Sequence, residues 1–152
     1  MKISVYAICK NEELFIEDMI KSCYEADEIV ICDTGSSDRT IDIIKQYNVK
    51  LLNIHVSPWR FDDARNIALS QTTGDICISL DADERLEPGL ISALRNQVNV
   101  KPGLLITHSF KTIWDWQKDN KNVSHHLHNR IHSRHGFRWV NCVHEELVGA
   151  TE

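Results

Sequence analysis

Two carboxylates, Asp81 and Asp83, stand two residues apart directly after the apolar run Asp75–Leu80. In an extended segment, side chains at positions i and i+2 point to the same side. Mg²⁺ takes oxygen ligands and usually uses one or two carboxylates together with substrate phosphates. The spacing therefore predicts a Mg²⁺ or Mn²⁺ site shared with a diphosphate. A pair of turn or capping carboxylates is the structural alternative for the same residues.

Asp33 follows a second apolar run, Glu28–Cys32, and precedes the small residues Thr34–Ser37. A carboxylate here can accept hydrogen bonds from a ribose or from the N–H of a nucleobase. The same string is similar to the signature of aspartic proteases, which need two such aspartates sharing a proton. This chain has one, and the segment after it has a helical pattern. We therefore favour a nucleotide contact over a protease.

Arg65 and Asn66 lie in the first turns of a predicted helix, Asp62–Gln71, on the side opposite its apolar residues. A helix N-terminus favours anions, and a guanidinium can bind a phosphate or a carboxylate through two parallel hydrogen bonds. We expect Arg65 to hold a nucleotide or its phosphates. A solvated helix face would carry the same residue types.

Five of the eight histidines fall in the segment His125–His135. If this segment is a strand, one of its faces carries His126, His128, Arg130, His132 and Arg134. We expect a solvated or phosphate-facing basic strand, because the Cys and His spacings of a dedicated zinc site are missing. A partial zinc site at His128 and His132 is the alternative.

A histidine and two carboxylates, His144, Glu145 and Glu146, follow the predicted strand Arg138–Val143. This arrangement offers a metal ligand and a general base side by side. A polar strand end is the alternative interpretation.

The elements that must position these groups alternate between strand and helix patterns. The apolar runs predict strands at Lys2–Cys9, Glu28–Cys32, Val49–Val56 and Asp75–Leu80. Helical spacing predicts helices at Glu13–Tyr24, Arg39–Tyr47, Asp62–Gln71 and Pro88–Val98, with Ser37 or Asp38 as the N-cap of the second. Short apolar strands alternating with helices indicate a parallel sheet covered on both faces.

The second half of the chain has a different pattern. Leu104–Trp116 and Ser124–His144 carry strand-like stretches without crossover helices, and Asp119–Asn122 is a turn signal. We predict an α/β fold with a mostly parallel central sheet flanked by helices. The C-terminal part should extend this sheet in a mixed or antiparallel manner.

Polar clusters fall at the carboxyl ends of the predicted strands. They are Lys10–Glu12, Asp33–Asp38, the loop that leads to Arg65, and Asp81–Glu84. In open α/β sheets, ligands bind beyond these ends, near the point where the strand order reverses. We therefore expect the clusters to form one site.

Length and composition limit the possible classes of protein. With 152 residues, 42% of them apolar, the chain is expected to form one domain, residues 1–152. A net charge of −5 disfavours nucleic-acid binding by bulk electrostatics. The sequence has neither an apolar run of about 20 residues, the length that spans a bilayer, nor a signal-peptide pattern. We expect a cytoplasmic protein without a transmembrane segment, which would be peripheral to a membrane if its binding partner is anchored there.

Five cysteines, an odd number, include no C-x-x-C pair. Cys9, Cys32 and Cys77 lie in predicted strands, where a reduced thiol packs as a small apolar group. We expect these thiols to belong to the core.

Together, these motifs resemble the family 2 glycosyltransferases with the GT-A fold. The branch of interest has D-T-G-S-x-D, A-R-N, D-A-D-E and V-H-E motifs, which stand here at Asp33–Asp38, Ala64–Asn66, Asp81–Glu84 and Val143–Glu145. The segment Ala7–Glu12 is also similar to the family's first strand and its K-N-E ending. The resemblance covers nearly the whole chain, with the motifs in the family's order.

The resemblance implies an inverting transferase that moves a sugar from a nucleoside diphosphate sugar, such as a UDP- or GDP-sugar, to a hydroxyl of a glycan or lipid-linked acceptor. It implies a nucleotide-binding half, about residues 1–100, and a metal and acceptor half, about residues 101–152. It also implies Mn²⁺ or Mg²⁺, held by Asp83 and His144, and a general base at Glu145, with Glu146 as the second choice. Its donor contacts would be Ala7, Cys9, Asn11, Glu12, Asp33, Arg65, Asp81, Ala82 and Arg130.

The chain departs from the family in two respects. Many relatives have a glutamate–aspartate pair at the base position and a later Q-x-x-R-W motif, and both are missing here. We expect either a minimal enzyme or the catalytic part of a longer chain. A nucleotidyltransferase and a binding module without turnover are the competing functions. The nucleotidyltransferase is disfavoured because Lys10–Glu12 is not a glycine-rich basic loop.

Overall fold

The computed structural model describes residues 1–97, 99, 101, 103–113 and 123–149. Its first half contains β1 (Ile3–Cys9), α1 (Ile16–Ser22), β2 (Glu28–Asp33), α2 (Thr40–Ile44), β3 (Lys50–Asn53), α3 (Phe61–Ser70) and β4 (Ile76–Ser79). Its second half contains β5 (Glu84–Arg85), α4 (Leu90–Gln97), β6 (Leu105–Ile113), β7 (Val123–Ser133), β8 (Phe137–Val140) and β9 (Glu146–Gly149). The expected turn at Asp119–Asn122 lies outside the described residues.

The central sheet has seven strands in the order β3-β2-β1-β4-β7-β6-β5. Strands β1 to β4 are parallel to one another, whereas β7 joins β4 in antiparallel orientation and β6 and β5 continue in that way. The predicted α/β fold with an antiparallel extension is therefore confirmed. The strand order reverses at β1, which has β2 on one side and β4 on the other.

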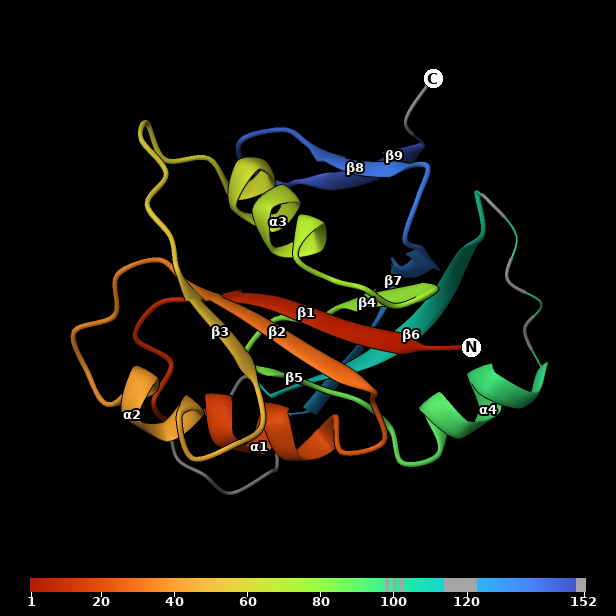
Figure 1. Cartoon of the computed structure of the whole chain (residues 1–152), viewed down its shortest axis with the longest axis horizontal. Helices are drawn as coiled ribbons and strands as arrows, with labels where there is room; N and C mark the ends of the chain where they lie inside the picture. The colour runs from red at the N-terminus through yellow and green to blue at the C-terminus, as the bar shows by residue number, and fades with distance from the viewer. Residues whose placement is uncertain (98, 100, 102, 114–122, 150–152) are drawn as a thin grey trace.

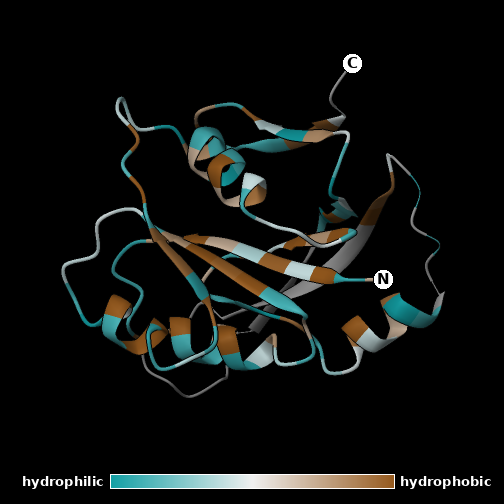
Figure 2. Cartoon of the chain, viewed as in Figure 1, coloured by the Kyte–Doolittle hydropathy of each residue, from teal (hydrophilic) through white to brown (hydrophobic). Residues whose placement is uncertain are grey.

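The two faces of the sheet carry separate cores (Figure 1). On one face, β1 presents Val5 and Ala7 to a cluster that includes residues from α1, α2 and α4. On the other face, Tyr6 packs with Ala68 of α3 and Trp139 of β8. Figure 2 shows apolar residues along the strands of the sheet and interspersed with polar residues in the helices. This alternation along β1 follows from the two-residue period of a strand.

Several elements, α1, α2 and β3 among them, are shorter than the sequence pattern predicts, whereas α3 has the predicted length. The first helix begins at Ile16 and not at Glu13, whose N–H donates to Asp38 Oδ2. The second begins at Thr40, and its N-cap is Arg39 without a side-chain cap bond, so the predicted cap at Ser37 or Asp38 is wrong. Asp38 precedes the N-cap and still accepts the backbone N–H of Thr40, the first residue of the helix, over 2.9 Å.

Strands β8 and β9 form a separate two-stranded sheet, so the expectation that this segment extends the main sheet is wrong. The main sheet has no room for it beside β4, because β7 occupies that edge. The β8–β9 hairpin packs against α3 on the same side of the central sheet, and its Trp139 reaches Tyr6 of β1 (Figure 1). Its apolar residues Trp139 and Leu147 belong to the core cluster under α3.

The expected basic face of β7 is also corrected. The pairing between β6 and β7 passes from Ile106–Ile131 to Thr107–Asn129, so Arg130 is the extra residue of a β-bulge. The bulge breaks the alternation, and His132 is fully buried instead of solvated. The side chain of His126 lies outside the described part of the chain.

A chain of hydrogen bonds explains the buried histidine. The Trp139 indole N–H donates to the Tyr6 hydroxyl over 2.8 Å, and that hydroxyl lies 2.9 Å from His132 Nε2. His132 Nδ1 lies 2.8 Å from the carbonyl oxygen of Ser133. All three contacts are satisfied if Tyr6 donates to a neutral His132 that carries its proton on Nδ1. Burial lowers the pKa of His132 to about 4, in agreement with a neutral ring.

The cysteine prediction is confirmed for the sheet. Cys9, Cys32 and Cys77 are buried in β1, β2 and β4 as free thiols. Cys23 is buried as well, whereas Cys142 is exposed.

We predict that His132 makes stability depend on pH. An unfolded histidine has a pKa of about 6.5, so between about pH 6.5 and 4 the unfolded state takes up a proton that the folded state refuses. The contribution is complete above pH 6.5 and is lost as the pH falls towards 4. Urea unfolding should therefore show the wild type losing up to about 3 kcal/mol more over this range than His132→Gln.

The matched control is His135→Gln, because His135 is exposed in the turn after β7. Its pH dependence should follow the wild type. Equal slopes for the wild type and His132→Gln would contradict the assignment.

Candidate active site

A cleft of about 970 Å³ opens at the carboxyl ends of β1, β2 and β4. It brings together residues from segments that are distant in the sequence: Cys9 and Glu12 after β1, Thr34 and Gly35 after β2, Arg65 from α3, Asp81, Ala82 and Asp83 after β4, and Glu145 before β9. The predicted polar clusters thus meet where the strand order reverses, which is where this class of sheet binds ligands.

Asp81–Glu84 forms a turn and not the extended segment that the carboxylate spacing suggested. The N–H of Glu84 donates to the carbonyl of Asp81 over 3.0 Å. The N–H of Asp81 donates back to Glu84 Oε2 over 2.8 Å. The turn therefore separates the surroundings of Asp81 and Asp83: Asp81 makes ion pairs with Arg65 and Arg130, and within the described residues Asp83 makes none.

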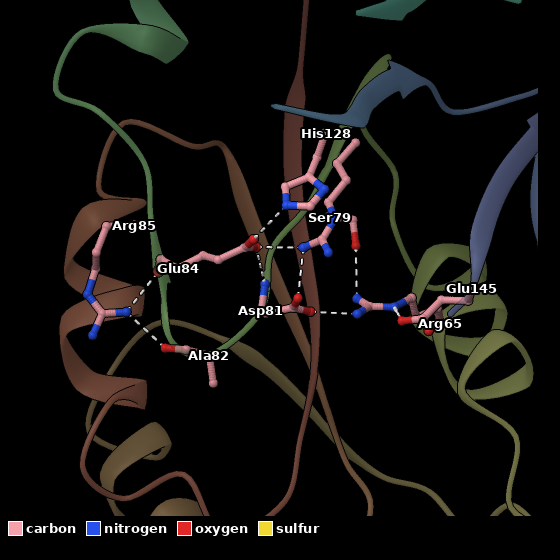
Figure 3. A network of polar contacts seen from close by, with 9 residues as sticks. Arg65, Ser79, Asp81, Ala82, Glu84, Arg85, His128 and Glu145 are labelled. Carbon is pink, nitrogen blue, oxygen red and sulfur yellow. Dashed lines mark hydrogen bonds and ion pairs between the residues drawn. The ribbon is translucent and has the colours of Figure 1, made fainter. Parts of the chain in front are cut away.

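Arg65 is the centre of the site. It is buried, with 4% of its surface exposed. Its Nη2 donates to Asp81 over 2.5 Å, its Nε to Glu145 over 2.6 Å, and its Nη1 to Ser79 over 3.2 Å. Figure 3 shows these three acceptors around the guanidinium. The helix therefore does not leave Arg65 on a solvated face; it directs the side chain into the protein.

The electrostatics of Arg65 follow from these contacts. Burial disfavours its charge, but the carboxylates of Asp81 and Glu145 outweigh burial and raise its pKa further above the usual range. The indole ring of Trp139 lies under the guanidinium, 5.0 Å from ring centroid to Cζ, and adds a cation–π contact. The site therefore contains a permanent, immobile positive charge.

Arg130 holds the other side of Asp81. Its Nη1 donates to Asp81 Oδ2 over 2.8 Å and to Glu84 Oε2 over 2.6 Å. Burial opposes the ionisation of Asp81, but the two guanidinium groups of Arg65 and Arg130 outweigh it and hold the pKa of Asp81 well below its usual range. For Glu84, burial and the charge of Asp81 prevail and raise the pKa to about 7. Asp81 is thus a fixed carboxylate between two arginines.

Asp83 and Glu12 also line the cleft, and neither makes an ion pair with a cation among the residues that the structure describes. Burial and the charge of Asp81 raise the pKa of Asp83. Burial, followed by the charges of Asp83, Asp38 and Asp81, raises the pKa of Glu12. Part of the cleft wall therefore carries unbalanced negative potential, which a bound cation would relieve.

The loop after β2 is organised by Asp33. Its buried carboxylate accepts the N–H groups of Gly35 and Ser36, each over 2.9 Å, and the Ser36 hydroxyl. Asn11 fixes the same loop from β1 by accepting the N–H of Ser37. Thr34 and Gly35 line the cleft, whereas Asp33, Asn11 and the buried Ala7 are absent from its lining. Asp33 and Asn11 thus shape the wall by holding its backbone.

A second cavity of about 640 Å³ contains the remaining predicted site residues. Arg130, His144 and Glu146 line it together with His128 and Val143. Phe61 and Glu145 line both cavities. His144 therefore faces a different space from Asp83. Among the residues that the structure describes, no three His, Cys, Asp or Glu side chains gather as a metal-binding group.

Sequence reasoning missed several residues that build the site. Ser79 and Trp139 contact Arg65. Trp59 and Phe61 pack edge to face, 5.1 Å between ring centroids, on the cleft wall. Trp59 and Phe61, which stand shortly before the A-R-N motif, could have been predicted from the sequence as part of the cleft wall. No local pattern marks Ser79 or Trp139, because their role comes from contact with a distant helix.

A family profile described as glycosyl transferase family 2 matches residues 4–145. The chain belongs to this family. Among curated proteins, the lipopolysaccharide core biosynthesis glycosyltransferase LpsC of Rhizobium meliloti is 34% identical over 93 residues, which cover 59% of this chain and 34% of LpsC. The first three curated relatives are matched over 34%, 26% and 30% of their length, so this family 2 chain spans about a third of them or less.

Two solved structures of known enzymes share the GT-A fold of this family 2 chain. Staphylococcus aureus TarS, residues 1–349 in complex with UDP, is 25% identical, with 63% of this chain and 31% of that chain covered and a TM-score of 0.57. Glucosyl-3-phosphoglycerate synthase from Mycobacterium tuberculosis, in complex with Mn²⁺, UDP and phosphoglyceric acid, is 26% identical. It matches over 68% of this chain and 41% of that chain, with a TM-score of 0.56.

We predict that removing the charge of Arg65 is strongly destabilising. Arg65→Met leaves Glu145 without its buried arginine and leaves Asp81 with Arg130 alone, and breaking a buried ion pair from one side costs about 3–5 kcal/mol. The measurement is the free energy of unfolding in urea at neutral pH.

Arg39→Met is the control, because the Arg39–Glu13 pair has an arginine side chain that is 78% exposed. Exposed pairs contribute about 1 kcal/mol or less. Similar losses in the two variants would show that Arg65 does not organise a buried charge cluster.

Proposed function

We propose that this chain carries the catalytic chemistry of an inverting, metal-assisted glycosyltransferase with a UDP-sugar donor and an acceptor hydroxyl. The observation that carries the proposal is that the loops after β1, β2 and β4 meet Arg65 and Glu145 around one cleft. TarS and glucosyl-3-phosphoglycerate synthase, both structurally similar to this chain, were solved with UDP.

The nucleotide would bind where the walls are backbone and small side chains. Cys9, Thr34 and Gly35 line that part of the cleft, and Asp33 holds the loop in place with its carboxylate. The diphosphate and sugar would then lie towards Arg65, Asp81 and Asp83. Arg65 lines this end together with its carboxylate partners Asp81 and Glu145, and Asp81 and Ala82 would meet ribose or donor sugar where they line the cleft.

The donor set at Asp83 fits a hard divalent cation. Asp83 and Glu12 offer carboxylate oxygens to the cleft, and burial raises the pKa of the nearby Cys9 thiol, so it stays protonated and is a poor soft ligand. Oxygen donors of this kind suit Mg²⁺ and Mn²⁺. Asp83 would hold the ion, together with the donor phosphates. When bound, it would neutralise charge on the departing diphosphate. The position of His144 in the second cavity gives no support for the expected second ligand.

The general base would be Glu145. A base must touch the acceptor hydroxyl and also lie beside the donor's reactive carbon. Glu145 lines both cavities, whereas Glu146 lines only the second. The hydrogen bond from Arg65 Nε to Glu145 Oε1 fixes the carboxylate and leaves Oε2 for the acceptor. This arrangement favours Glu145 over Glu146.

The reaction would be a single displacement. The acceptor oxygen would form a bond to the anomeric carbon from the second cavity, while the bond from that carbon to the diphosphate oxygen breaks in the first. The electron pair leaves with the nucleoside diphosphate, and the acceptor proton passes to Glu145. Attack from the side opposite the leaving group inverts the anomeric configuration.

The acceptor would be a hydroxyl of a cell-surface glycan or a lipid-linked precursor. LpsC is named for lipopolysaccharide core biosynthesis and TarS as a poly(ribitol-phosphate) β-N-acetylglucosaminyltransferase, so both relatives are named for polymers of this kind. In the described part of the chain, no helix combines the length and apolarity needed to cross a bilayer. We propose action in the cytoplasm, at the membrane surface where such acceptors are built.

We predict that Glu145→Gln abolishes sugar transfer and preserves donor binding. Glutamine keeps the hydrogen bond to Arg65 but cannot take a proton, and loss of a general base costs about 10²–10⁴-fold in rate. Transfer is measured as UDP release in the presence of acceptor, and binding by calorimetry with UDP.

Glu146→Gln is the matched control and should keep transfer within about twofold. A reversed pattern would make Glu146 the base. If the wild type binds UDP but releases none from any UDP-sugar, the protein is a binding module and the proposal fails.

We predict that Asp83→Asn removes the dependence of UDP binding on Mn²⁺. The neutral amide loses the charge that holds the cation, so the affinity gained by adding Mn²⁺ should fall at least tenfold. Calorimetry with UDP, with and without Mn²⁺, measures this gain.

Asp42→Asn, an exposed carboxylate of α2, is the control and should bind as the wild type does. An undiminished Mn²⁺ effect in Asp83→Asn would remove the metal assignment.

A further inference from the structure

Asn66, next to Arg65, uses its side chain to bind the backbone of one residue in β8. Its Nδ2 donates to the carbonyl oxygen of Trp139 over 2.9 Å, and the N–H of Trp139 donates to its Oδ1 over 2.8 Å. A primary amide carries the same donor and acceptor as a peptide group. Asn66 thus pairs with the outer edge of β8 as a neighbouring strand would.

The β8–β9 hairpin depends on outside support. A two-stranded hairpin alone is marginally stable in water. The backbone N–H of Phe61 adds a second, longer bond to the carbonyl of Cys142, over 3.3 Å. The segment between the strands contains two residues other than glycine with positive φ, Asn141 at 77° and His144 at 55°. Helix α3 therefore holds the backbone of the hairpin at two places, at Trp139 through Asn66 and at Cys142 through Phe61.

Trp139 transmits this attachment to Arg65. Its indole N–H is bound to Tyr6 in the central sheet, which fixes the plane of the ring. One face of that ring lies against the Arg65 guanidinium, and Arg65 Nε holds Glu145. The contacts form a closed ring from Asn66 to Trp139, to Arg65, to Glu145 and back along the hairpin. Two adjacent residues of α3 thus bind the hairpin: Asn66 binds the backbone of Trp139, and Arg65 binds the carboxylate of Glu145.

We propose that Asn66 is a positioning residue for the reaction: it sets Trp139 under Arg65 and thereby holds Glu145 at the junction of the two cavities. This role rests on the proposed function, in which Glu145 is the base. In this proposal, each of the three residues Ala64–Asn66 has a different role. Ala64 packs in the buried face of α3, Arg65 carries the charge, and Asn66 holds the strand.

The test combines kinetics with hydrogen exchange. Asn66→Ala removes both bonds to Trp139, and it should lower kcat for transfer at least tenfold while KM for the UDP-sugar stays within about threefold. Exchange of the Trp139 indole N–H, followed by NMR, should become at least tenfold faster. The backbone amides of β1 and β2 should keep their protection, because the central sheet does not depend on the two hydrogen bonds between Asn66 and Trp139.

Asn96→Ala, an exposed asparagine of α4, is the control and should match the wild type in both measurements. If Asn66→Ala does not fold, Asn66→Asp serves instead. It keeps the acceptor for the Trp139 N–H and replaces the donor with an oxygen that repels the Trp139 carbonyl.

Three results overturn the proposal: an unchanged kcat, a lower kcat with unchanged indole exchange, and faster exchange that extends equally to β1 and β2. The last would mean general destabilisation. Because hydrogen exchange is measured without substrate, it tests whether Asn66 holds Trp139 in place even if the wild type transfers no sugar. That latter outcome would refute the proposed function separately.

Discussion

A buried guanidinium has to be paired, because an isolated charge in the protein interior is expensive. Arg65 forms ion pairs with Asp81 and Glu145, and the indole ring of Trp139 packs against the face of its guanidinium. The three partners come from the end of β4 and from the β8–β9 hairpin. One side chain of α3 thereby connects the central sheet to the hairpin, and the cleft takes its shape from this connection.

The negative charges of the site fall into two classes with different electrostatics. Asp81 lies between Arg65 and Arg130, which hold its pKa low and leave it committed to the protein. In the described part of the chain Asp83 and Glu12 make no such ion pair, and burial together with neighbouring carboxylates raises their pKa values. The structure thus separates an acidic motif into a carboxylate that builds the site and carboxylates whose charge is available to a ligand. The turn at Asp81–Glu84 produces the separation.

Much of the fold follows from patterns in the sequence. The apolar runs that became β1, β2 and β4 place polar residues at their carboxyl ends, and parallel pairing brings those ends to one edge. Helix ends were predicted less well. The N–H of Glu13 bonds to Asp38 in another loop and the first helix begins only at Ile16, while the second helix begins at Thr40, whose N–H Asp38 accepts. The histidine strand was misinterpreted because a bulge at Arg130 changes which side chains face the core.

What the sequence alone determined is the order of the first four strands and the four helices, the chemical types of the site residues and their location at the strand ends. These depend on local periodicity and on motif spacing, which need no knowledge of distant contacts. Tertiary structure alone decided that Arg65 points inward, that Asp33 shapes a loop, and that His144 and Asp83 face different cavities. It also decided that the last hairpin leaves the main sheet. Each of these results depends on contacts between groups that are far apart in the chain. A local pattern in the sequence does not show which distant groups will meet.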